Sequence, residues 1–252
     1  MDRLIASRLA DVLTIVDAPE VTREQLLRVH AGDYIDRIEA QIPAQGYASL
    51  DPDTIVSPGS LAAARHAAGA AVAAVDAVMT DETDNAFCCV RPPGHHAERG
   101  RAMGFCLYNN IAVGAAHALD AHGLSRVAII DFDVHHGNGT ENIFDDDERI
   151  LFCSTFQHPF YPFTPLLDNT RNRVSVPLDA TAGSAEFRAA VKDHWLPALE
   201  RFAPEMIFVS AGFDAHVADD MSGVSLVDDD LSLIHISEPT RPFTLSRMPS
   251  SA

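Results

Sequence analysis

Acidic and imidazole side chains follow a short apolar run at 127–130, within the sequence VAIIDFDVHHGN. Asp131, Asp133 and His135 are spaced by two residues, and because side chains alternate along an extended strand, all three can project to the same side. Two carboxylates and one imidazole that converge make a donor set for a divalent cation. The alternative is a solvated strand end whose side chains cap the backbone, so these residues alone do not decide between the two interpretations.

Two further apolar runs end in the same kind of chemistry. The run at 86–90 leads into the sequence RPPGHH, which ends in His95 and His96, and the run at 206–210 leads into AGFDAH, which contains Asp214. Ligands of open α/β sheets bind beyond the carboxyl ends of the strands, so the three clusters are expected to meet in one crevice. Prolines and a glycine before the histidine pair predict a rigid turn on which the two rings point in different directions.

A catalytic metal site is the interpretation that this convergence favours. Asp133, His135 and Asp214 would supply three ligands and leave a position open for water, which is typical of catalytic rather than structural sites. A zinc ion in such a site lowers the pKa of its bound water and polarises a carbonyl oxygen, so amide hydrolysis is the predicted reaction.

Hydrolysis also requires proton transfer, and His95 and His96 are the predicted groups. Imidazoles in such roles are usually oriented by a carboxylate or an amide, for which Asp131 and Asn138 are available.

The elements that must position these clusters alternate between helices and strands, which predicts an α/β fold with a parallel sheet. Helices are expected at 22–40 with a break at Gly32, at 61–79 after the Ser57-Pro58 start, at 110–122, at 140–144 and at 184–202 with a kink at Pro197; buried strands are expected at 86–90, 127–130, 150–154 and 206–210. The segment 41–60 is expected to be a long surface loop, in which Asp51 and Asp53 either contact a substrate or serve turn chemistry.

Composition excludes several classes of protein. The 252 residues carry 36 acidic and 18 basic side chains, a net charge of −18, which disfavours direct nucleic-acid binding and suits either a cationic substrate or solubility. The four cysteines lie in or beside apolar runs and are expected to be core residues of a reduced protein. The N-terminus has no signal-peptide pattern and no apolar run approaches about 20 residues, so we expect no membrane span and a cytoplasmic location.

Four sequence motifs together resemble one known family. They are RPPGHHA at 91–97, GFCLYNN at 104–110, DFDVHHGNGT at 131–140 and SAGFDAH at 210–216, and in this order they resemble the zinc-dependent histone deacetylase superfamily. Asn138 and Thr140 are more similar to its class II and bacterial branch. The resemblance implies the three-layer α/β/α arginase/deacetylase fold with a central, mostly parallel sheet, and it implies hydrolysis of an acetyl amide by metal-activated water.

The same resemblance implies a role for each of the residues already singled out. It implies one zinc ion per chain on Asp133, His135 and Asp214. It implies His96 as general base, and His95 as the second histidine with an electrostatic or acid role. Asp131 and Asn138 would be the partners of this pair.

It further implies a narrow substrate channel and a second, structural ion. Phe105, presented by the turn at Gly104, and Tyr161 would be the channel walls, with Asp53 as a further substrate contact. A potassium ion would be bound near the central strand through Asp131, Asp133, His135 and Ser154 with backbone oxygens. The expected partners are an acetylated lysine peptide or an acetylated polyamine; the sequence does not determine the oligomeric state.

The C-terminus departs from the family pattern. Residues 1–230 are expected to form a deacetylase domain that is incomplete at its C-terminus, and 231–252 an unrelated, disordered tail that resembles read-through of an adaptor or a shifted reading frame. No Tyr follows Tyr161, so the family's transition-state Tyr loop has no counterpart here. Two alternatives to an acetyl-lysine deacetylase therefore stay open: an acetylpolyamine amidohydrolase and a catalytically impaired metal-binding module. An arginase-like two-metal enzyme is excluded, because it needs further Asp ligands near His95 and Asp214.

Overall fold

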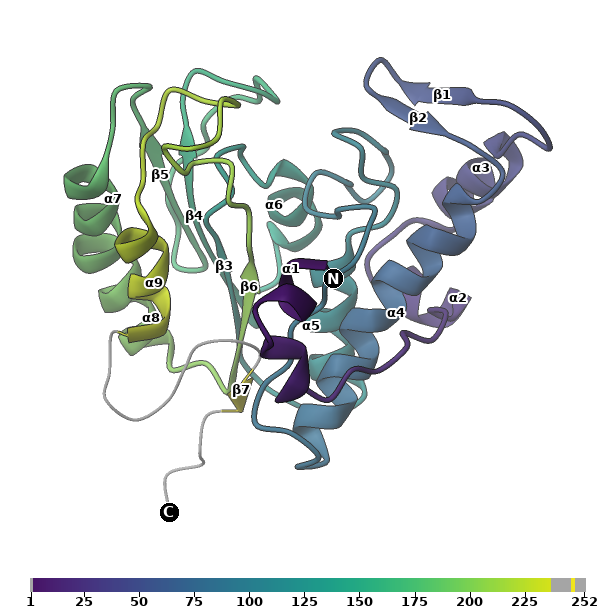
Figure 1. The fold of residues 1–252 in the computed structure, drawn as a ribbon, viewed down its shortest axis with the longest axis horizontal. Coiled ribbons are helices and arrows are strands. Elements are labelled where there is room, and N and C mark those ends of the chain that lie inside the picture. Colours follow the sequence, from purple (N-terminus) through teal and green to yellow (C-terminus); the bar gives the residue numbers. More distant parts are fainter. Residues whose placement is uncertain (1, 237–245, 248–252) are drawn as a thin grey trace.

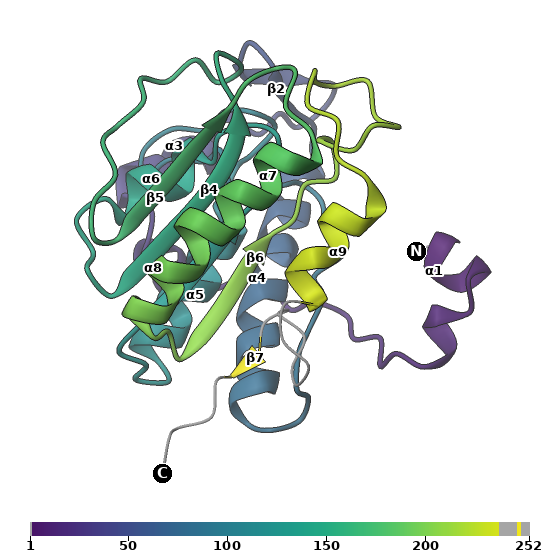
Figure 2. The ribbon, with the colours of Figure 1, turned by 90° about the vertical axis from the view of Figure 1, so that its left-hand side faces the viewer.

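A five-stranded sheet lies between two layers of helices in the computed structural model, which describes residues 2–236 and 246–247 (Figures 1 and 2). Its strand order is β5-β4-β3-β6-β7. The strands are β3 (Val127–Asp131), β4 (Ile150–Gln157), β5 (Arg173–Leu178), β6 (Met206–Ser210) and β7 (Ser246–Arg247). All adjacent pairs are parallel except β6 and β7. The predicted three-layer α/β/α architecture with a mostly parallel sheet is confirmed.

One face of the sheet is covered by α4 (Ser60–Met79) and α5 (Asn110–Asp120), with α2 (Arg23–Leu27) and α3 (Gly32–Gln41) outside them (Figure 1). The other face is covered by α7 (Ser184–Ala190), a π-helical turn (Val191–Trp195), α8 (Leu196–Phe202) and α9 (Asp228–Ile236). The shorter elements are α1 (Asp2–Ala6), a 3-10 turn (Leu9–Asp11), the hairpin of β1 (Ala48–Asp51) and β2 (Thr54–Val56), and α6 (Asn138–Phe144).

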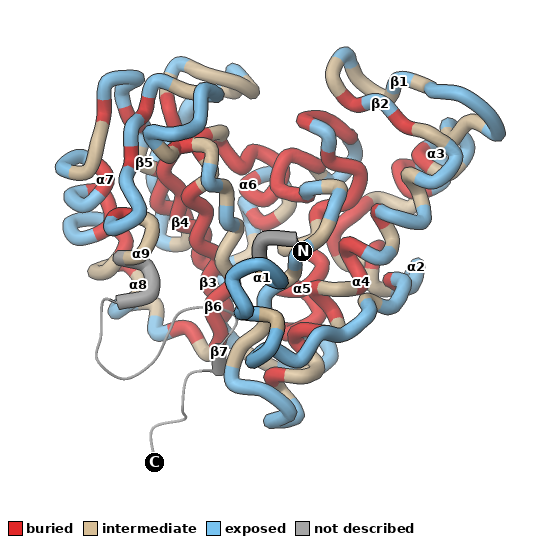
Figure 3. Tube along the Cα trace, in the orientation of Figure 1, coloured by how far each residue is buried: buried red, intermediate tan, exposed pale blue. Residues whose placement is uncertain are grey.

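Alternation along the central strand divides the interior into two cores. Val127 and Ile129 pack into the core beneath α4 and α5, whereas Ala128 and Ile130 pack into the core beneath α7 and α8. β3 and β4 are buried along their whole length (Figure 3). A strand covered on both faces reads as a continuous apolar run, which explains why β3 was visible in the sequence.

Several helix ends follow the sequence signals. Thr22 caps α2 in a reciprocal capping box with Gln25. A break does separate α2 from α3, but it lies at 28–31, and Gly32 is the first residue of α3. The helix expected at 184–202 is interrupted by a π-helical turn at Val191–Trp195, and Pro197 lies in the first turn of α8 that follows. Three starts differ from the expectation. α4 begins at Ser60 rather than at Ser57-Pro58, α6 begins at Asn138 rather than Thr140, and Gly183 rather than Ser184 caps α7.

Three sequence expectations were wrong. The segment 86–90 is not a strand and is partly exposed, because the described part of the chain offers it no hydrogen-bonded partner strand. For the same reason Cys89 is exposed, whereas Cys106 and Cys153 are buried. The loop expected at 41–60 contains the β1–β2 hairpin, whose turn residues Asp51 and Asp53 dominated the sequence pattern.

The sequence analysis expected no apolar run close to about 20 residues, and helix α4 differs from that expectation. It has 20 residues with a mean hydropathy of 1.3, sufficient by length and composition to cross a membrane. Alanine accounts for much of that hydropathy, and half of the helix is buried inside the protein, as is usual for a core helix.

The tail expected at 231–252 lies largely outside the described residues. Within it, the structure describes only 231–236, which complete α9, and 246–247, which form β7.

Candidate active site

The polar cluster after β3 is arranged by bends of the backbone rather than by strand alternation. β3 ends at Asp131, whose Oδ1 accepts a hydrogen bond from the backbone N–H of Asp133 (3.1 Å). Asp133 Oδ1 in turn accepts from the N–H of His135 (2.9 Å). Each carboxylate therefore fixes the turn that places the next functional side chain, and the expectation of an extended strand through 135 was wrong.

Asp214 reaches this cluster from the neighbouring strand. It follows β6, which pairs with β3 in register so that Asp131 lies opposite Ser210. Its Oδ1 accepts from the N–H of Val134 (3.0 Å), which holds the carboxylate against the bend after β3.

Asp133, His135 and Asp214 present three ligand atoms to a common point. His135 Nδ1 lies 3.0 Å from Asp133 Oδ1 and 2.9 Å from Asp214 Oδ2. The three ligand atoms lie within 4.8 Å of one another, and each side chain is less than about a quarter exposed. Two carboxylate oxygens and one imidazole nitrogen in this arrangement fit a divalent cation such as zinc.

Glycines allow the backbone to approach these carboxylates. A Cβ on Gly212 would lie 2.2 Å from Asp133 Oδ2, and a Cβ on Gly137 would lie 2.4 Å from Asp131 Oδ2. Both contacts are too short for any real side chain, so the site requires glycine at these two positions.

His95 is held by a carboxylate at the end of β3. Its Nδ1 donates to Asp131 Oδ2 (3.0 Å), and its Nε2 lies 3.9 Å from Asp133 Oδ2. Burial lowers the pKa of His95, but the two carboxylates outweigh burial and raise it to about 9.

His96 has a different partner, as expected for two histidines with two roles. Its ring lies 4.0 Å from that of His95, and its Nδ1 lies 2.8 Å from Asn138 Oδ1. The other end of that amide, Nδ2, donates to Glu98 Oε1 (2.8 Å). Because Glu98 accepts from Nδ2, Asn138 presents its oxygen to His96, so His96 carries its proton on Nδ1 and leaves Nε2 unprotonated.

The pKa values of the two histidines are also displaced in opposite directions. Burial, followed by the positive charge on His95, lowers the pKa of His96 to about 3. Two adjacent imidazoles with pKa values displaced in opposite directions are typical of acid–base pairs. Glu98 was missed by the sequence analysis, although its position two residues after His96 was a signal.

The turn at Gly104 places Phe105 beside the histidine pair. Gly104 has a φ of +57°, and a Cβ there would lie 2.3 Å from His96 Cδ2. The β1–β2 hairpin holds this turn: Asp53 Oδ1 accepts from Gly104 N–H (3.2 Å) and Thr54 Oγ1 from Phe105 N–H (3.2 Å). Phe105 is 59% exposed, so its ring is available at the rim. Asp53 thus contacts the turn that presents Phe105.

Two further aromatic rings lie against the histidines of the site. The ring of Tyr161 is 5.2 Å from that of His96 and perpendicular to it. Phe160 stacks on His135 with ring centroids 5.2 Å apart. Phe160 was not singled out from the sequence, where only its neighbour Tyr161 was expected at the site. Burial, and then the nearby Asp53 carboxylate, raise the pKa of Tyr161.

Ser154 lies beneath the site on β4, directly opposite Asp131 in the parallel register. Its Oγ is fully buried and has no hydrogen-bond partner among the described residues. A buried hydroxyl without a partner is costly. Its position beside the Asp131 carboxylate fits an oxygen-coordinated cation such as potassium.

Comparisons with known proteins show which sequences and structures this chain resembles. The family described as "Histone deacetylase domain" matches residues 1–236. A histone deacetylase-like amidohydrolase of Pseudomonas aeruginosa is 42% identical over 233 residues, which cover 90% of this chain and 61% of that protein. The polyamine deacetylase HDAC10 of Homo sapiens is 36% identical over 236 residues, which cover 87% of this chain and 35% of that protein. This chain therefore spans less than two thirds of the length of either relative.

A solved structure shows the same fold. The crystal structure of the HDA15 HD domain superposes with a TM-score of 0.83 at 34% sequence identity, covering 91% of this chain and 71% of that one.

Proposed function

Because this chain belongs to the histone deacetylase family, we propose that it is a zinc-dependent amidohydrolase that removes the acetyl group from acetyl-lysine or a related acetylated amine. One observation carries the proposal: the three clustered ligand atoms of Asp133, His135 and Asp214 lie beside two histidines that have separate partners. A zinc ion held by these three residues would lower the pKa of its bound water and polarise the substrate carbonyl.

His96 is the proposed general base. Its Nδ1–H is committed to Asn138, so the lone pair on Nε2 is free to take a proton from the attacking water. The lowered pKa keeps this ring neutral near pH 7, so it is ready to accept.

His95 is the proposed electrostatic partner and acid. Its Nδ1–H is donated to the buried carboxylate of Asp131, which favours the charged form of the ring. A positive charge beside the reacting carbonyl stabilises the oxyanion that develops there, and the ring can return a proton to the leaving amine.

The buried carboxylate of Asp131 has two proposed functions: it holds the residues of the catalytic site in place, and it binds a structural potassium ion. Its Oδ2 orients His95 and its Oδ1 fixes the backbone of Asp133. We place potassium between Asp131 and Ser154, where it would satisfy the unpartnered Ser154 hydroxyl.

Two substrate classes fit this site. A relative named as a polyamine deacetylase and another named as a histone deacetylase-like amidohydrolase are both similar to this chain. An N-acetylated polyamine keeps its other charged amines, and a basic peptide keeps its other basic side chains, so the net charge of −18 suits the approach of either. A narrow entrance between Phe105 and Tyr161 would admit an unbranched acetylated chain.

Acetate release from an acetyl-lysine peptide and from an N-acetylated polyamine, measured side by side with zinc supplied, tests the proposal. His96→Ala should lower kcat by about 10²- to 10⁴-fold on whichever substrate is hydrolysed. His66→Ala changes an exposed histidine on α4 and is the matched control. Hydrolysis that is equally fast in His96→Ala and the wild type would contradict the assignment of the base.

A further inference from the structure

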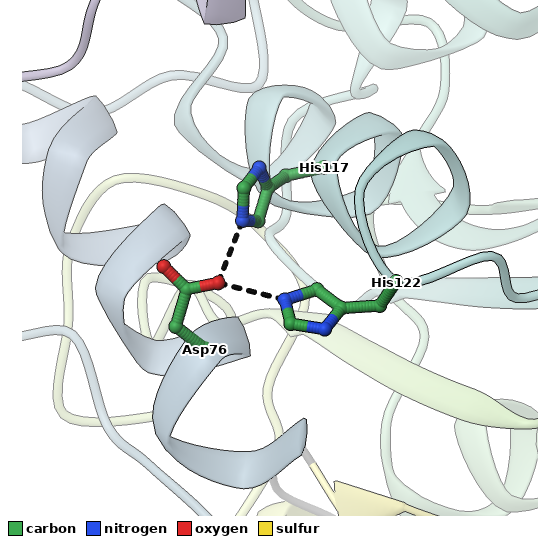
Figure 4. Close-up of side chains that lie close together, drawn as sticks. All are labelled: Asp76, His117 and His122. Carbon is green, nitrogen blue, oxygen red and sulfur yellow. Dashed lines mark hydrogen bonds and ion pairs between the residues drawn. The ribbon is translucent and has the colours of Figure 1, made fainter. Parts of the chain in front are cut away.

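A second group of metal-type ligands lies between two helices on one face of the sheet. Asp76 belongs to α4, His117 to the last turn of α5, and His122 to the turn that follows α5 (Figure 4). His122 precedes Gly123, whose φ of +70° turns the chain back so that the two histidines face the same carboxylate. This arrangement is separate from the histidine pair of the active site.

The three side chains converge on a single oxygen. The Nε2 atoms of His117 and His122 each lie 2.7 Å from Oδ1 of Asp76. All three ligand atoms lie within 4.8 Å of one another. Side-chain exposures of 8% for His117, 21% for His122 and 50% for Asp76 leave the point of convergence open to solvent on one side.

We propose that Asp76, His117 and His122 form a second binding site for a divalent transition-metal ion such as Zn²⁺, which links α4 to α5. Two imidazole nitrogens and one carboxylate oxygen are a donor set that zinc prefers, with solvent completing the coordination. Ligand atoms of a tetrahedral zinc site lie about 3.3 Å apart. The present contacts of 2.7 Å would therefore open by less than about 1 Å.

The site lies away from the proposed catalytic centre. α5 begins at Asn110, next to the loop of His95 and His96, and His117 and His122 lie at its other end. β3 begins after His122, at Val127, and ends at Asp131. His122 therefore lies near the amino end of β3, and the proposed catalytic centre lies at its carboxyl end. An ion here would act on the packing of α4 against α5 and not on the reacting carbonyl.

Arg28 sets the protonation of the site. Its Nη1 lies 2.7 Å from His117 Nδ1, and because a guanidinium only donates, His117 carries its proton on Nε2 and donates it to Asp76. A metal ion bound to Nε2 of His117 requires the ring proton to lie on Nδ1 instead. The new Nδ1–H of His117 would face Arg28, which then has to turn toward Asp120, whose Oδ2 lies 3.9 Å from Arg28 Nε.

Arg28 and a bound metal ion require the ring proton of His117 on different nitrogens. Replacing Arg28 should therefore raise the affinity for zinc, whereas replacing a ligand should lower it. Arg28→Gln replaces the donor with an amide whose oxygen can accept the Nδ1–H of His117, so zinc should bind this variant at least about tenfold more tightly than it binds the wild type. His122→Gln and Asp76→Asn each remove one ligand and should weaken the same site at least about tenfold. His66→Gln is the matched control, because His66 also lies on α4 beside a carboxylate, Glu20, but belongs to no group of three metal-type ligands among the described residues.

The measurement is zinc bound per chain and its affinity, determined by calorimetric titration of untagged, chelator-treated protein. The wild type and His66→Gln should bind about two ions. Asp133→Ala should lose the first ion and keep the second, whereas His122→Gln and Asp76→Asn should show the reverse. A second ion that persists in His122→Gln, or a wild type without a second ion, would overturn the proposal. If the proposed catalytic zinc site were wrong, the wild type would lack the ion that depends on Asp133. The ion that depends on His122 and Asp76 could still be measured.

Discussion

His96 Nδ1 lies 2.8 Å from Asn138 Oδ1, so an amide at the start of α6 determines which nitrogen of the proposed base carries the proton. Glu98 fixes the orientation of that amide by accepting from its Nδ2. The free Nε2 of His96 is thus a consequence of a chain of two hydrogen bonds that joins the histidine loop to the helix after β3.

Replacing the amide tests this relationship. Asn138→Leu removes the acceptor and should lower kcat/KM about 10- to 100-fold while zinc content is unchanged. Asn138→Asp keeps an acceptor but adds a negative charge, which favours protonated His96 and should move the acid limb of the pH–rate profile to higher pH. A leucine variant with the kcat/KM of the wild type would show that His96 needs no orienting partner.

Gly212 offers a way to disturb the metal site without removing a ligand. A Cβ at this position would lie 2.2 Å from Asp133 Oδ2, so Gly212→Ala must displace that carboxylate. We expect zinc affinity to fall at least about tenfold, measured by competition with a chromogenic chelator. Gly100→Ala, which adds a methyl group where no atom lies within 4 Å, should leave the affinity unchanged. Equal affinities of the two variants would contradict the close packing described at Asp133.

His30 predicts a specific dependence of stability on pH. Burial lowers its pKa from 6.5 to about 4, and its nitrogens are occupied by Glu98 O and the N–H of Asn109. Because the folded-state pKa lies below the unfolded value, the unfolded chain takes up the proton first. The stabilisation is therefore complete above pH 6.5 and is lost as the pH falls towards about 4, by about 3 kcal/mol in total.

Urea unfolding of the wild type and His30→Gln as a function of pH measures this contribution. Gln can donate to Glu98 O and accept from Asn109 N–H but does not titrate. The difference in unfolding free energy between the two proteins should therefore change by up to about 1.4 kcal/mol per pH unit, most steeply midway between the two pKa values, at about pH 5. A difference that stays constant from neutral pH down to pH 5 would rule out a neutral, buried His30.

The parts of the fold that were predictable are those with local signals. β3 and β6 are continuous apolar runs followed by polar clusters, and α2 has a capping box, so their types and ends could be inferred. The strand expected at 86–90 shows the limit of this reasoning, because a short apolar run does not reveal whether a partner strand exists.

Strand β5 was not predicted, because polar residues interrupt its apolar pattern. Its buried positions include Arg173 and Ser175, which are polar and hide the strand pattern. They are tolerated because Arg173 pairs with Asp145 and Ser175 donates to Glu141 (3.2 Å), and both partners come from the region of α6. Such tertiary pairing cannot be read from the sequence of the strand itself.

In the candidate site, too, features with a local sequence signal could be predicted, and features that depend on contacts between distant segments could not. The residue types and spacing of Asp131, Asp133 and His135 pointed to a cation site, although the backbone bends that unite them were not foreseen. The contributions of Glu98 and Phe160 depend on contacts between separate loops, so neither followed from the motifs alone.

The most direct test of the account is zinc content and acetate release of Asp133→Ala in the His122→Gln background, where the second site does not contribute. His122→Gln alone should bind about one zinc ion per chain and hydrolyse an acetylated amine. Adding Asp133→Ala should remove both properties, whereas adding Asp220→Ala, which alters an exposed carboxylate in the segment that follows Asp214, should change neither. Undiminished zinc binding and hydrolysis in the Asp133→Ala variant would contradict the proposed catalytic centre.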